Sequence, residues 1–202
     1  IARAFSAMTS AAKALTAARR TAAPKLTASV KRHLADLGFA KSGFSISLDP
    51  LGMPGPLGCE SAEFLFSPNP GEPERPLRAI ASSGEISRVM LAIKTALAAQ
   101  DSVPVLIFDE IDANVGGEIG AKVGAKMKEL GRSHQVFCIT HLPQVAALAS
   151  SHFIVAKDTA GKRTSTSLTE AEGAFREVEI ARMLGGNAGS ALSHAKALLK
   201  EG

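Results

Sequence analysis

The sequence contains no tryptophan and no tyrosine, and only two cysteines occur among its 202 residues. Without Trp or Tyr, the chain lacks the aromatic platform on which many proteins stack unpaired bases. Two cysteines are too few for a disulfide framework, and Cys138 lies in an apolar run, which favours a small core residue over a redox centre. We therefore expect a reducing compartment, the cytoplasm.

Long hydrophobic runs are missing as well. Because no stretch of about 18 apolar residues occurs, no membrane span is expected. The opening segment lacks the apolar stretch of a secretory signal, and since it begins with Ile1 rather than Met we expect a fragment or a processed chain. The net charge of +4 is compatible with nucleic-acid contact, and the 46% of hydrophobic residues suffices for one large core or for two lobes.

The first part of the chain predicts a helical segment followed by antiparallel strands. Residues 1–37 are rich in Ala, Lys, Arg and Leu, which favours one or two helices that end at Gly38. From Phe44 to Phe66 apolar residues alternate in FSISL and AEFLF, which predicts a β-hairpin or small antiparallel sheet. DPLGMPGPLG reads as its turn-rich connector, and the Pro-rich segment 67–76 marks a boundary.

The second half alternates between helices and short apolar strands, an order typical of βαβ units. Apolar residues recur at helical spacing from Ile86 to Leu97 and from Ile119 to Leu130, and another helix begins at Pro143. Buried strands are predicted at VPVLIF and QVFCIT and a third strand at FIVAK, followed by a hairpin near DTAGKRTSTSL and helices at 177–184 and 191–199. We expect an α/β fold with a mostly parallel sheet and a small antiparallel segment.

Polar residues follow two of these strands at the edge where parallel sheets collect ligands. Asp109 and Glu110 come directly after VPVLIF, and His141 follows QVFCIT. One carboxylate there can hold Mg²⁺, while the other polarises an attacking water. His141 can bond to a phosphate oxygen or to that water. The structural alternative is that the acids cap the following turn or helix.

A metal site made of His134, Cys138 and His141 is a further alternative. On a strand, residues 134 and 138 share a face, but residue 141 is out of phase with them. No fourth ligand occurs at a familiar spacing, so the pattern argues against such a site.

The segment IASSGEISRVMLAIK opens a predicted helix with small polar residues. Ser82 and Glu85 form an S-x-x-E capping box, which is sufficient as a structural explanation. The cap does not require Ser83 or Gly84, and small residues leave backbone N–H groups uncovered at the positive end of a helix. Such a helix start suits a phosphate group.

In this order and spacing, SSGE, LIFDEID and THLPQVA resemble the signature motif, the Walker B motif with its D-loop, and the switch-histidine loop of ABC-type ATPase heads of the SMC-like branch. FSPNPGEPERPLRAIASSGEISRVMLAIK, IFDEIDANVGG, HQVFCITHLPQVAALA and EIARMLGG together resemble the C-terminal part of the RecN family of bacterial DNA repair proteins, from about Phe64 to His194. The resemblance implies a helical arm at the end of a coiled coil over residues 1–40. It implies the C-terminal portion of an ABC-type ATPase head over residues 41–202.

The resemblance also implies a role for the helix start. Ser82, Ser83 and Gly84, with Glu85, would contact the γ-phosphate of ATP bound to an opposing head. The family pattern usually reads Ser-Gly-Gly-Glu, so Ser83 departs from it. If the position requires a positive φ, a serine costs about 1 kcal/mol there. The alternative is that its hydroxyl adds a phosphate contact.

The residues after the two strands would complete the catalytic site by the same resemblance. Asp109 would help to hold Mg²⁺, and Glu110 would be the catalytic base. Asp112 would be the D-loop acid at the dimer seam, and His141 would sense the γ-phosphate.

A phosphate-cradling P-loop, G-x-x-x-x-G-K-[ST], is absent. The one Gly-Lys pair, Gly161-Lys162, has Ala156 in place of the first glycine and is followed by Arg163. The family carries this motif in the N-terminal half of the head. The partners implied are therefore that N-terminal half, a second head and DNA, with ATP and Mg²⁺ as cofactors. We expect an ATPase of DNA double-strand break repair and recombination, cytoplasmic and nucleoid-associated, that is inactive as this chain alone.

Two other functions stay open. The chain fits the head of another SMC-like or transporter ATPase, or a non-catalytic DNA-binding scaffold, although the trio of Asp109, Glu110 and His141 argues against a degenerate head. A basic run in the first helical segment fits a solvated face or a direct DNA contact; it consists of Arg19, Arg20, Lys31 and Arg32.

Overall fold

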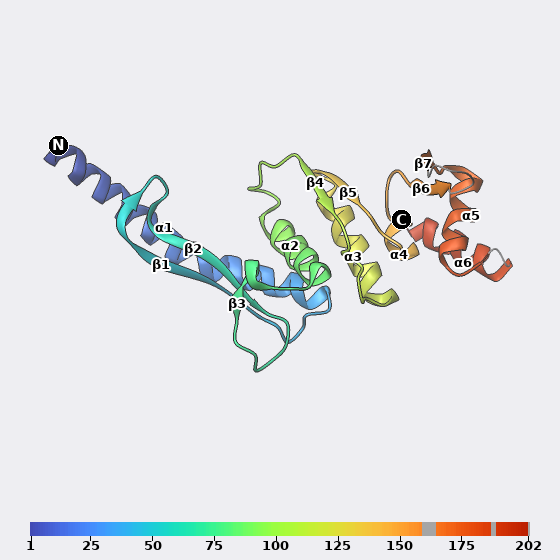
Figure 1. Ribbon diagram of the computed structural model, residues 1–202, viewed down its shortest axis with the longest axis horizontal. Coiled ribbons are helices and arrows are strands. Elements are labelled where there is room, and N and C mark those ends of the chain that lie inside the picture. Colours follow the sequence, from blue (N-terminus) through green and yellow to red (C-terminus); the bar gives the residue numbers. More distant parts are fainter. Residues whose placement is uncertain (159–164, 187–188, 202) are drawn as a thin grey trace. The chain divides into compact units, whose positions relative to one another are not determined.

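The computed structural model describes residues 1–158, 165–186 and 189–201, and the chain divides into two compact units, Ile1–Ser102 and Val103–Gly202 (Figure 1). Among these residues, the first unit contains a three-stranded sheet and the second contains two two-stranded sheets. No helix in the described part of the chain has the length and apolar character needed to cross a membrane.

The first unit begins with α1 (Ala2–Asp36), one helix of 35 residues that continues through Pro24. Its buried residues lie mostly in its second half, at Val30 and Leu34. Gly38 has a φ of +92°, which glycine adopts without strain, and α1 ends just before it as the sequence predicted.

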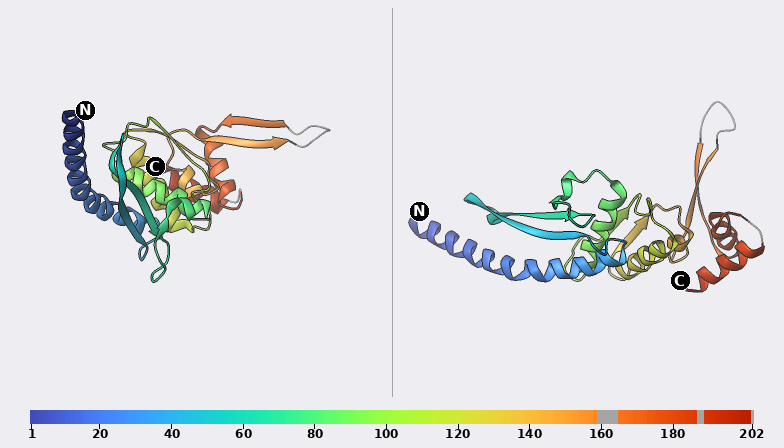
Figure 2. Two further views of the ribbon diagram at one scale, coloured as in Figure 1. Left: turned by 60° about the vertical axis from the view of Figure 1, so that its left-hand side comes forward. Right: turned by 90° about the horizontal axis from the view of Figure 1, so that it is seen from below.

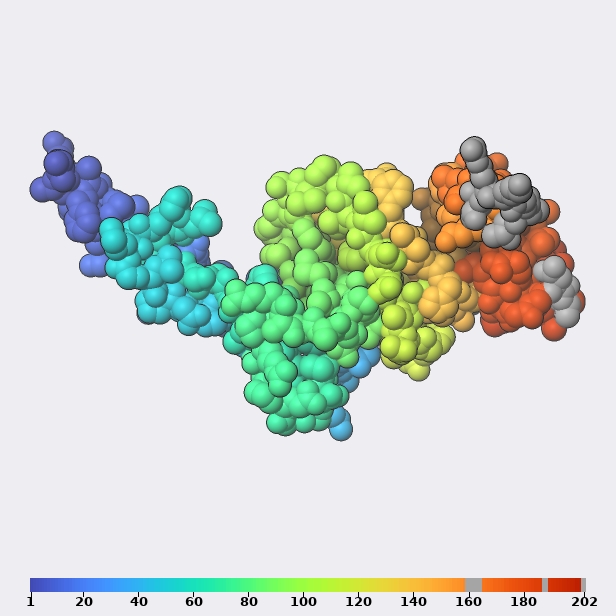
Figure 3. Space-filling model, viewed as in Figure 1, coloured from blue at the N-terminus to red at the C-terminus, as the bar shows by residue number. Residues whose placement is uncertain are grey.

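An antiparallel hairpin follows, formed by β1 (Gly43–Gly55) and β2 (Gly58–Ser67), and β3 (Arg75–Pro76) pairs with the far side of β2. The prediction of DPLGMPGPLG as a connector is wrong, because β1 continues through Gly55 and β2 begins at Gly58. β1 is an edge strand, so its prolines interrupt no central ladder, and its register shifts where they occur. The hairpin lies along α1 (Figures 2 and 3).

α2 (Ser83–Leu97) follows the short 3₁₀ turn η1 (Leu77–Ala79) and packs against α1. Its predicted apolar face is confirmed, since Val89 and Ile93 are buried. Arg88 is buried beside them, with its guanidinium carbon 5.0 Å from the centre of the ring of Phe39. This contact holds the start of α2 against the loop that follows α1.

In the second unit, β4 (Val105–Phe108), α3 (Gly117–Leu130) and β5 (Gln135–Cys138) form the predicted βαβ unit. β4 and β5 pair in parallel, and α3 runs beside them (Figure 1). The buried face of α3 carries Val123, Met127 and Leu130. Because both strands run in the same direction, the residues that follow each of them meet at one edge.

These two strands are not buried on both faces, although their apolar sequences predicted that they would be. Leu106 and Phe108 are buried. The opposite face exposes four large apolar side chains, here called the apolar sheet face: Val105 at 45%, Ile107 at 70%, Phe137 at 52% and Ile139 at 62% exposed. Ile107 lies opposite Phe137 in the parallel register, so these side chains form one continuous surface.

β6 (Phe153–Asp158) was predicted as a third strand of the parallel sheet, but it pairs in antiparallel fashion with β7 (Ser165–Glu170) (Figure 2). The assignment of FIVAK to the parallel sheet is therefore wrong, because its hydrogen-bonding partner is the next strand of the chain. The predicted hairpin is confirmed by the pairing of β6 with β7, and residues 159–164, which the prediction also covered, lie outside the described residues.

Three helices complete the second unit: α4 (Pro143–Ala146), α5 (Gly173–Met183) and α6 (Gly189–Glu201). Their shared core is formed by Ala146, Ala147, Ile180, Ala181 and Ala195. Arg176 of α5 donates hydrogen bonds from Nη2 to the carbonyl oxygens of residues 146, 147 and 149, at 3.1, 3.3 and 2.6 Å. It thereby caps the carbonyl end of α4 and of the turn that follows, where the carbonyl of Ala146 also accepts the N–H of Ala149 at 3.3 Å.

Candidate functional site

The loop after β4 presents two exposed carboxylates, Asp109 and Glu110. Oδ1 of Asp109 accepts a hydrogen bond from the backbone N–H of Glu110 at 2.9 Å. Glu110 has a φ of +54°, in the left-handed region, which costs a residue with a Cβ about 1 kcal/mol. Backbone strain of this kind gathers at functional sites, so it marks Glu110 as a candidate independently of any sequence motif.

Asp112, two residues further on, is only 3% exposed. Its Oδ2 accepts hydrogen bonds from the hydroxyl of Thr140 and from the backbone N–H of His141, the latter at 2.8 Å, and Nδ1 of His141 lies 3.2 Å from the same oxygen. The structure thus brings Asp112 and His141 together where β4 and β5 end. Thr140 was not predicted as a site residue, because a hydroxyl residue between a strand and His141 is a weak signal.

The alternative metal site is not supported by the structure. Burial, and to a lesser degree the charges of Asp112 and Asp109, together raise the pKa of the Cys138 thiol to about 12. A thiol with this pKa is protonated at neutral pH, so it is not a reactive nucleophile. Within the described ranges, no three His, Cys, Asp or Glu side chains are placed to share a metal ion, and His134 is buried.

The remaining predicted site residues lie at the start of α2 in the first unit. Ser82 is the N-cap of α2, and its Oγ accepts a hydrogen bond from the backbone N–H of Glu85 at 3.4 Å. This contact confirms the capping that the S-x-x-E pattern predicted. Ser83 is exposed and Gly84 is buried. The helix-start residues and the acidic loop therefore belong to separate units of the chain.

The backbone conformation explains how Ser83 is tolerated. Ser83 is the first residue of α2, and among the described residues other than glycine a positive φ occurs only at Glu110 and Asn114. The cost of placing a serine in the left-handed region therefore does not arise here. Ser83 fits the helix start without backbone strain and presents its side chain at an exposed position.

We expect Ser82→Ala to lower the free energy of unfolding by about 1 kcal/mol, because the N–H of Glu85 loses its acceptor. Ser82→Asn is the matched control, since asparagine also caps helices and should retain nearly all of the stability. Urea denaturation of both variants measures the difference. Equal stabilities of the alanine and asparagine variants would contradict the capping role.

No protein-family model matches the chain. Among curated proteins it is similar to the DNA repair protein RecN of Xylella fastidiosa, with 44% identity over 195 residues, which covers 95% of this chain and 35% of that protein. It is 43% identical over 200 residues to the DNA repair protein RecN of Treponema pallidum, again with 95% and 35% coverage. The chain spans about a third of the length of the curated relatives that it matches.

Solved structures of SMC heads share the fold. The Smc head domain with a coiled coil and joint from Pyrococcus yayanosii matches with a TM-score of 0.54 and 20% identity, over 87% of this chain and 28% of that chain. A structure from work on ATP-driven dimerization and DNA-stimulated activation of SMC ATPases matches with a TM-score of 0.50 and 20% identity, over 87% of this chain and 99% of that chain. At this level of identity the likeness establishes the fold alone, which is that of an SMC head.

Proposed function

Because this chain belongs to the RecN family of DNA repair proteins, we propose that it forms part of a head that binds and hydrolyses ATP in DNA double-strand break repair and recombination. The observation that carries the proposal is the 44% identity across 95% of the chain. The protein would act in the cytoplasm, at the nucleoid. Steady-state ATP hydrolysis by the full-length protein, with and without Glu110→Gln, tests the proposal.

The acidic loop fits the needs of Mg²⁺ and of an attacking water. Mg²⁺ in nucleotide sites binds one or two protein carboxylates and completes its shell with phosphate oxygens and water, so it needs no cage of protein ligands. Asp109 is an exposed carboxylate directly after β4 and would hold this ion, which supplies charge neutralisation to the phosphates. Glu110, also exposed, would accept the proton of the attacking water.

Two further sets of residues would contact phosphate. The side chain of His141 is 74% exposed while its backbone N–H is held by Asp112, so the ring is accessible to the γ-phosphate of a bound nucleotide. The start of α2 offers the positive end of a helix dipole at Ser82, Ser83 and Gly84. These residues and Glu85 would contact the γ-phosphate of ATP bound to a second head. The functional unit would then be a homodimer of heads.

The chain requires a partner segment to bind ATP well, because its sequence contains no P-loop. The apolar sheet face supports this view, since a sheet that exposes isoleucine and phenylalanine side chains at 52–70% is suited to burial against another element. We assign this face to the N-terminal half of the same head, which would carry the P-loop.

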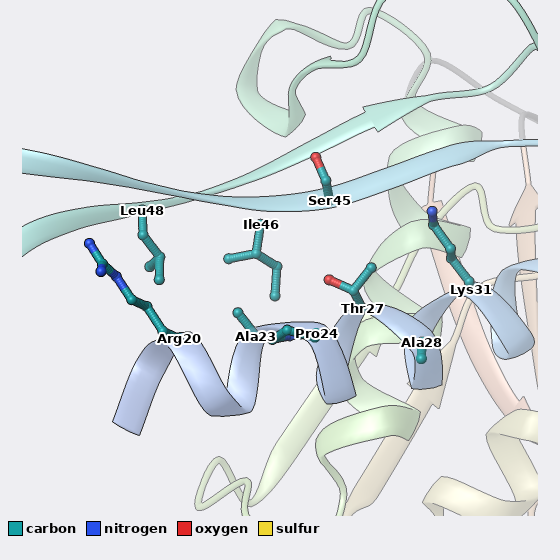
Figure 4. A pocket seen from close by; sticks show the side chains of 9 residues that line it. All are labelled: Arg20, Ala23, Pro24, Thr27, Ala28, Lys31, Ser45, Ile46 and Leu48. Atoms are coloured by element: carbon teal, nitrogen blue, oxygen red, sulfur yellow. The ribbon is translucent and has the colours of Figure 1, made fainter. Parts of the chain in front are cut away.

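DNA contact is proposed along α1. A pocket of about 550 Å³ lies between α1 and β1, with Arg20 and Lys31 extending from α1 on either side of apolar side chains that include Ile46 and Leu48 (Figure 4). Both basic residues are exposed. Arg19, in contrast, is half-buried and lies 3.6 Å from the carboxylate of Glu60. Arg20 and Lys31 are therefore the two cations of the basic run that both line this pocket and are exposed, while Arg32 is exposed outside it.

Reversing the charge at Arg20 and Lys31 together is expected to weaken DNA binding by the full-length protein. The slope of log K against log salt should become shallower by about 2, because two phosphate contacts are lost. Reversing Lys13 and Lys25 together is the matched control, since both are exposed on the same helix but do not line the pocket. Fluorescence anisotropy at several salt concentrations measures the slopes. An equal change for the control would assign the effect to diffuse charge rather than to this pocket.

A further inference from the structure

Three polar groups of one short segment converge on a single buried oxygen. The oxygen is Oδ2 of Asp112, which accepts the Thr140 hydroxyl and the His141 backbone N–H and lies 3.2 Å from Nδ1 of His141. A carboxylate with 3% exposure loses most of its hydration, so these donors must replace the lost water contacts. These buried contacts therefore fix Thr140 and His141 on the Asp112 carboxylate, which an exposed surface contact would not do.

The contacts of Asp112 join the ends of two neighbouring strands, β4 and β5. Asp112 lies in the turn after β4, and residues 140 and 141 follow β5, whose ladder is prolonged by the hydrogen bond from the N–H of Ile139 to the carbonyl of Phe108 at 2.9 Å. Thr140 extends the network, because its Oγ1 accepts the N–H of Leu142 at 3.0 Å. Since hydrogen bonds in a chain polarise one another, the segment 140–142 is held as a unit on the carboxylate.

The Asp112 carboxylate determines which ring nitrogen of His141 can contact a ligand. The carboxylate favours a proton on Nδ1, because a bare lone pair at 3.2 Å would face a negative charge. Nε2 lies on the opposite side of the ring, and the side chain is 74% exposed, so Nε2 is the nitrogen presented to a ligand.

We propose that Asp112 is the positioning residue of His141: one carboxylate oxygen fixes the segment 140–142 and keeps a proton on Nδ1, so that Nε2 faces the phosphate of a bound nucleotide. The role of the phosphate rests on the proposed ATPase function, whereas the state of the ring does not. Asp112 then acts on a residue of its own chain, and the contact across a dimer seam that the family resemblance implied stays a separate prediction.

A double-mutant cycle in the full-length protein tests how Asp112 acts. Asp112→Ala should lower kcat about 10-fold or more with little change in KM, and should cause less than about a 2-fold further loss when His141→Ala is already present. Asp112→Asn keeps an acceptor oxygen and should recover most of the loss. Additive losses in the cycle, or equal losses for the alanine and asparagine variants, would overturn the proposal.

The second readout needs no nucleotide. In full-length protein labelled with ¹⁵N-histidine, the ring shifts of His141 should report a proton on Nδ1 at a pH where the ring is neutral, and His141→Ala assigns the signal. Asp112→Ala should move the signal towards the mixed tautomers of a free imidazole. If the unsubstituted protein shows no proton on Nδ1, the proposal fails even when ATP is hydrolysed. If ATP is not hydrolysed, the ATPase function fails while the ring shifts still decide the role of Asp112.

Discussion

Glu110→Gln in the full-length protein is expected to lower ATP hydrolysis by about 10²-fold or more while leaving ATP binding largely intact. Glutamine has the same length and shape as glutamate, so the loop that begins at Asp109 should keep its conformation, including the positive φ at residue 110. What the variant loses is the carboxylate that would accept the proton of water. The expected result is therefore a loss in kcat rather than in nucleotide affinity.

The matched control for this experiment is Glu118→Gln. Glu118 lies in the first turn of α3, and its carboxylate pairs with Lys122 at 3.0 Å on the surface, where such a pair contributes little. We expect turnover within about 2-fold of the unsubstituted protein. Steady-state phosphate release and equilibrium nucleotide binding measure the two quantities. Unchanged turnover in Glu110→Gln would remove Glu110 from its role as the base.

The same assay separates the proposed ATPase from a non-catalytic scaffold. If hydrolysis releases the heads from each other, Glu110→Gln should accumulate dimers in the presence of ATP, which light scattering detects as a doubled mass. A full-length protein that binds DNA but shows no ATP turnover would favour the scaffold instead. The strained φ of +54° at Glu110 argues for catalysis, because a scaffold has no need to maintain that cost.

Hydrophobic periodicity was sufficient to predict α2, α3 and the parallel pair. The spacing from Ile86 to Leu97 predicted α2, and the alternation of apolar runs with helical patterns predicted the unit of β4, α3 and β5. These elements follow from local patterns, which a single sequence displays directly. The extension of β1 through its prolines was missed, since turn residues outweigh strand propensity unless the strand is known to lie at an edge.

The residues of the candidate site could be predicted from the sequence, but the hydrogen bonds between them could not. The position of Asp109 and Glu110 after an apolar run, and that of His141 after the next, follow from the sheet edge that both strands share. The bonds of Asp112 to Thr140 and His141 do not follow, because residues 28 and 29 positions apart meet only through the parallel register. The pairing of β6 was missed for the same reason: an apolar strand does not reveal its neighbour.

A continuous apolar strand also does not reveal whether both of its faces find partners within the same chain. VPVLIF and QVFCIT read as strands buried on both sides, yet the structure covers only the face of Leu106 and Phe108. Ile107 remains 70% exposed on the other side. Sequence patterns report what a strand is suited to contact, and the contact itself depends on which segments are present.

The second large effect is expected on MgATP binding, when the proposed N-terminal half of the head docks on the apolar sheet face. By isothermal titration calorimetry, the 202-residue chain alone should bind MgATP only weakly, because it lacks the P-loop cradle. Adding a separately produced N-terminal half of the head should bring binding into the micromolar range. Micromolar binding of MgATP by the chain alone would contradict the prediction that this chain holds only half of an ATP site.

Ile107→Glu should abolish that gain, since docking would bury a carboxylate without a partner at the centre of the apolar sheet face. We expect the association of the two halves to weaken by at least about 100-fold, which corresponds to about 2.7 kcal/mol. Leu168→Glu is the matched control, because Leu168 is 67% exposed but lies on β7, in another sheet. If both variants weaken the association equally, the apolar sheet face is not the docking surface. If only Ile107→Glu weakens the association, the N-terminal half docks on the apolar sheet face of β4 and β5 and completes the nucleotide site there.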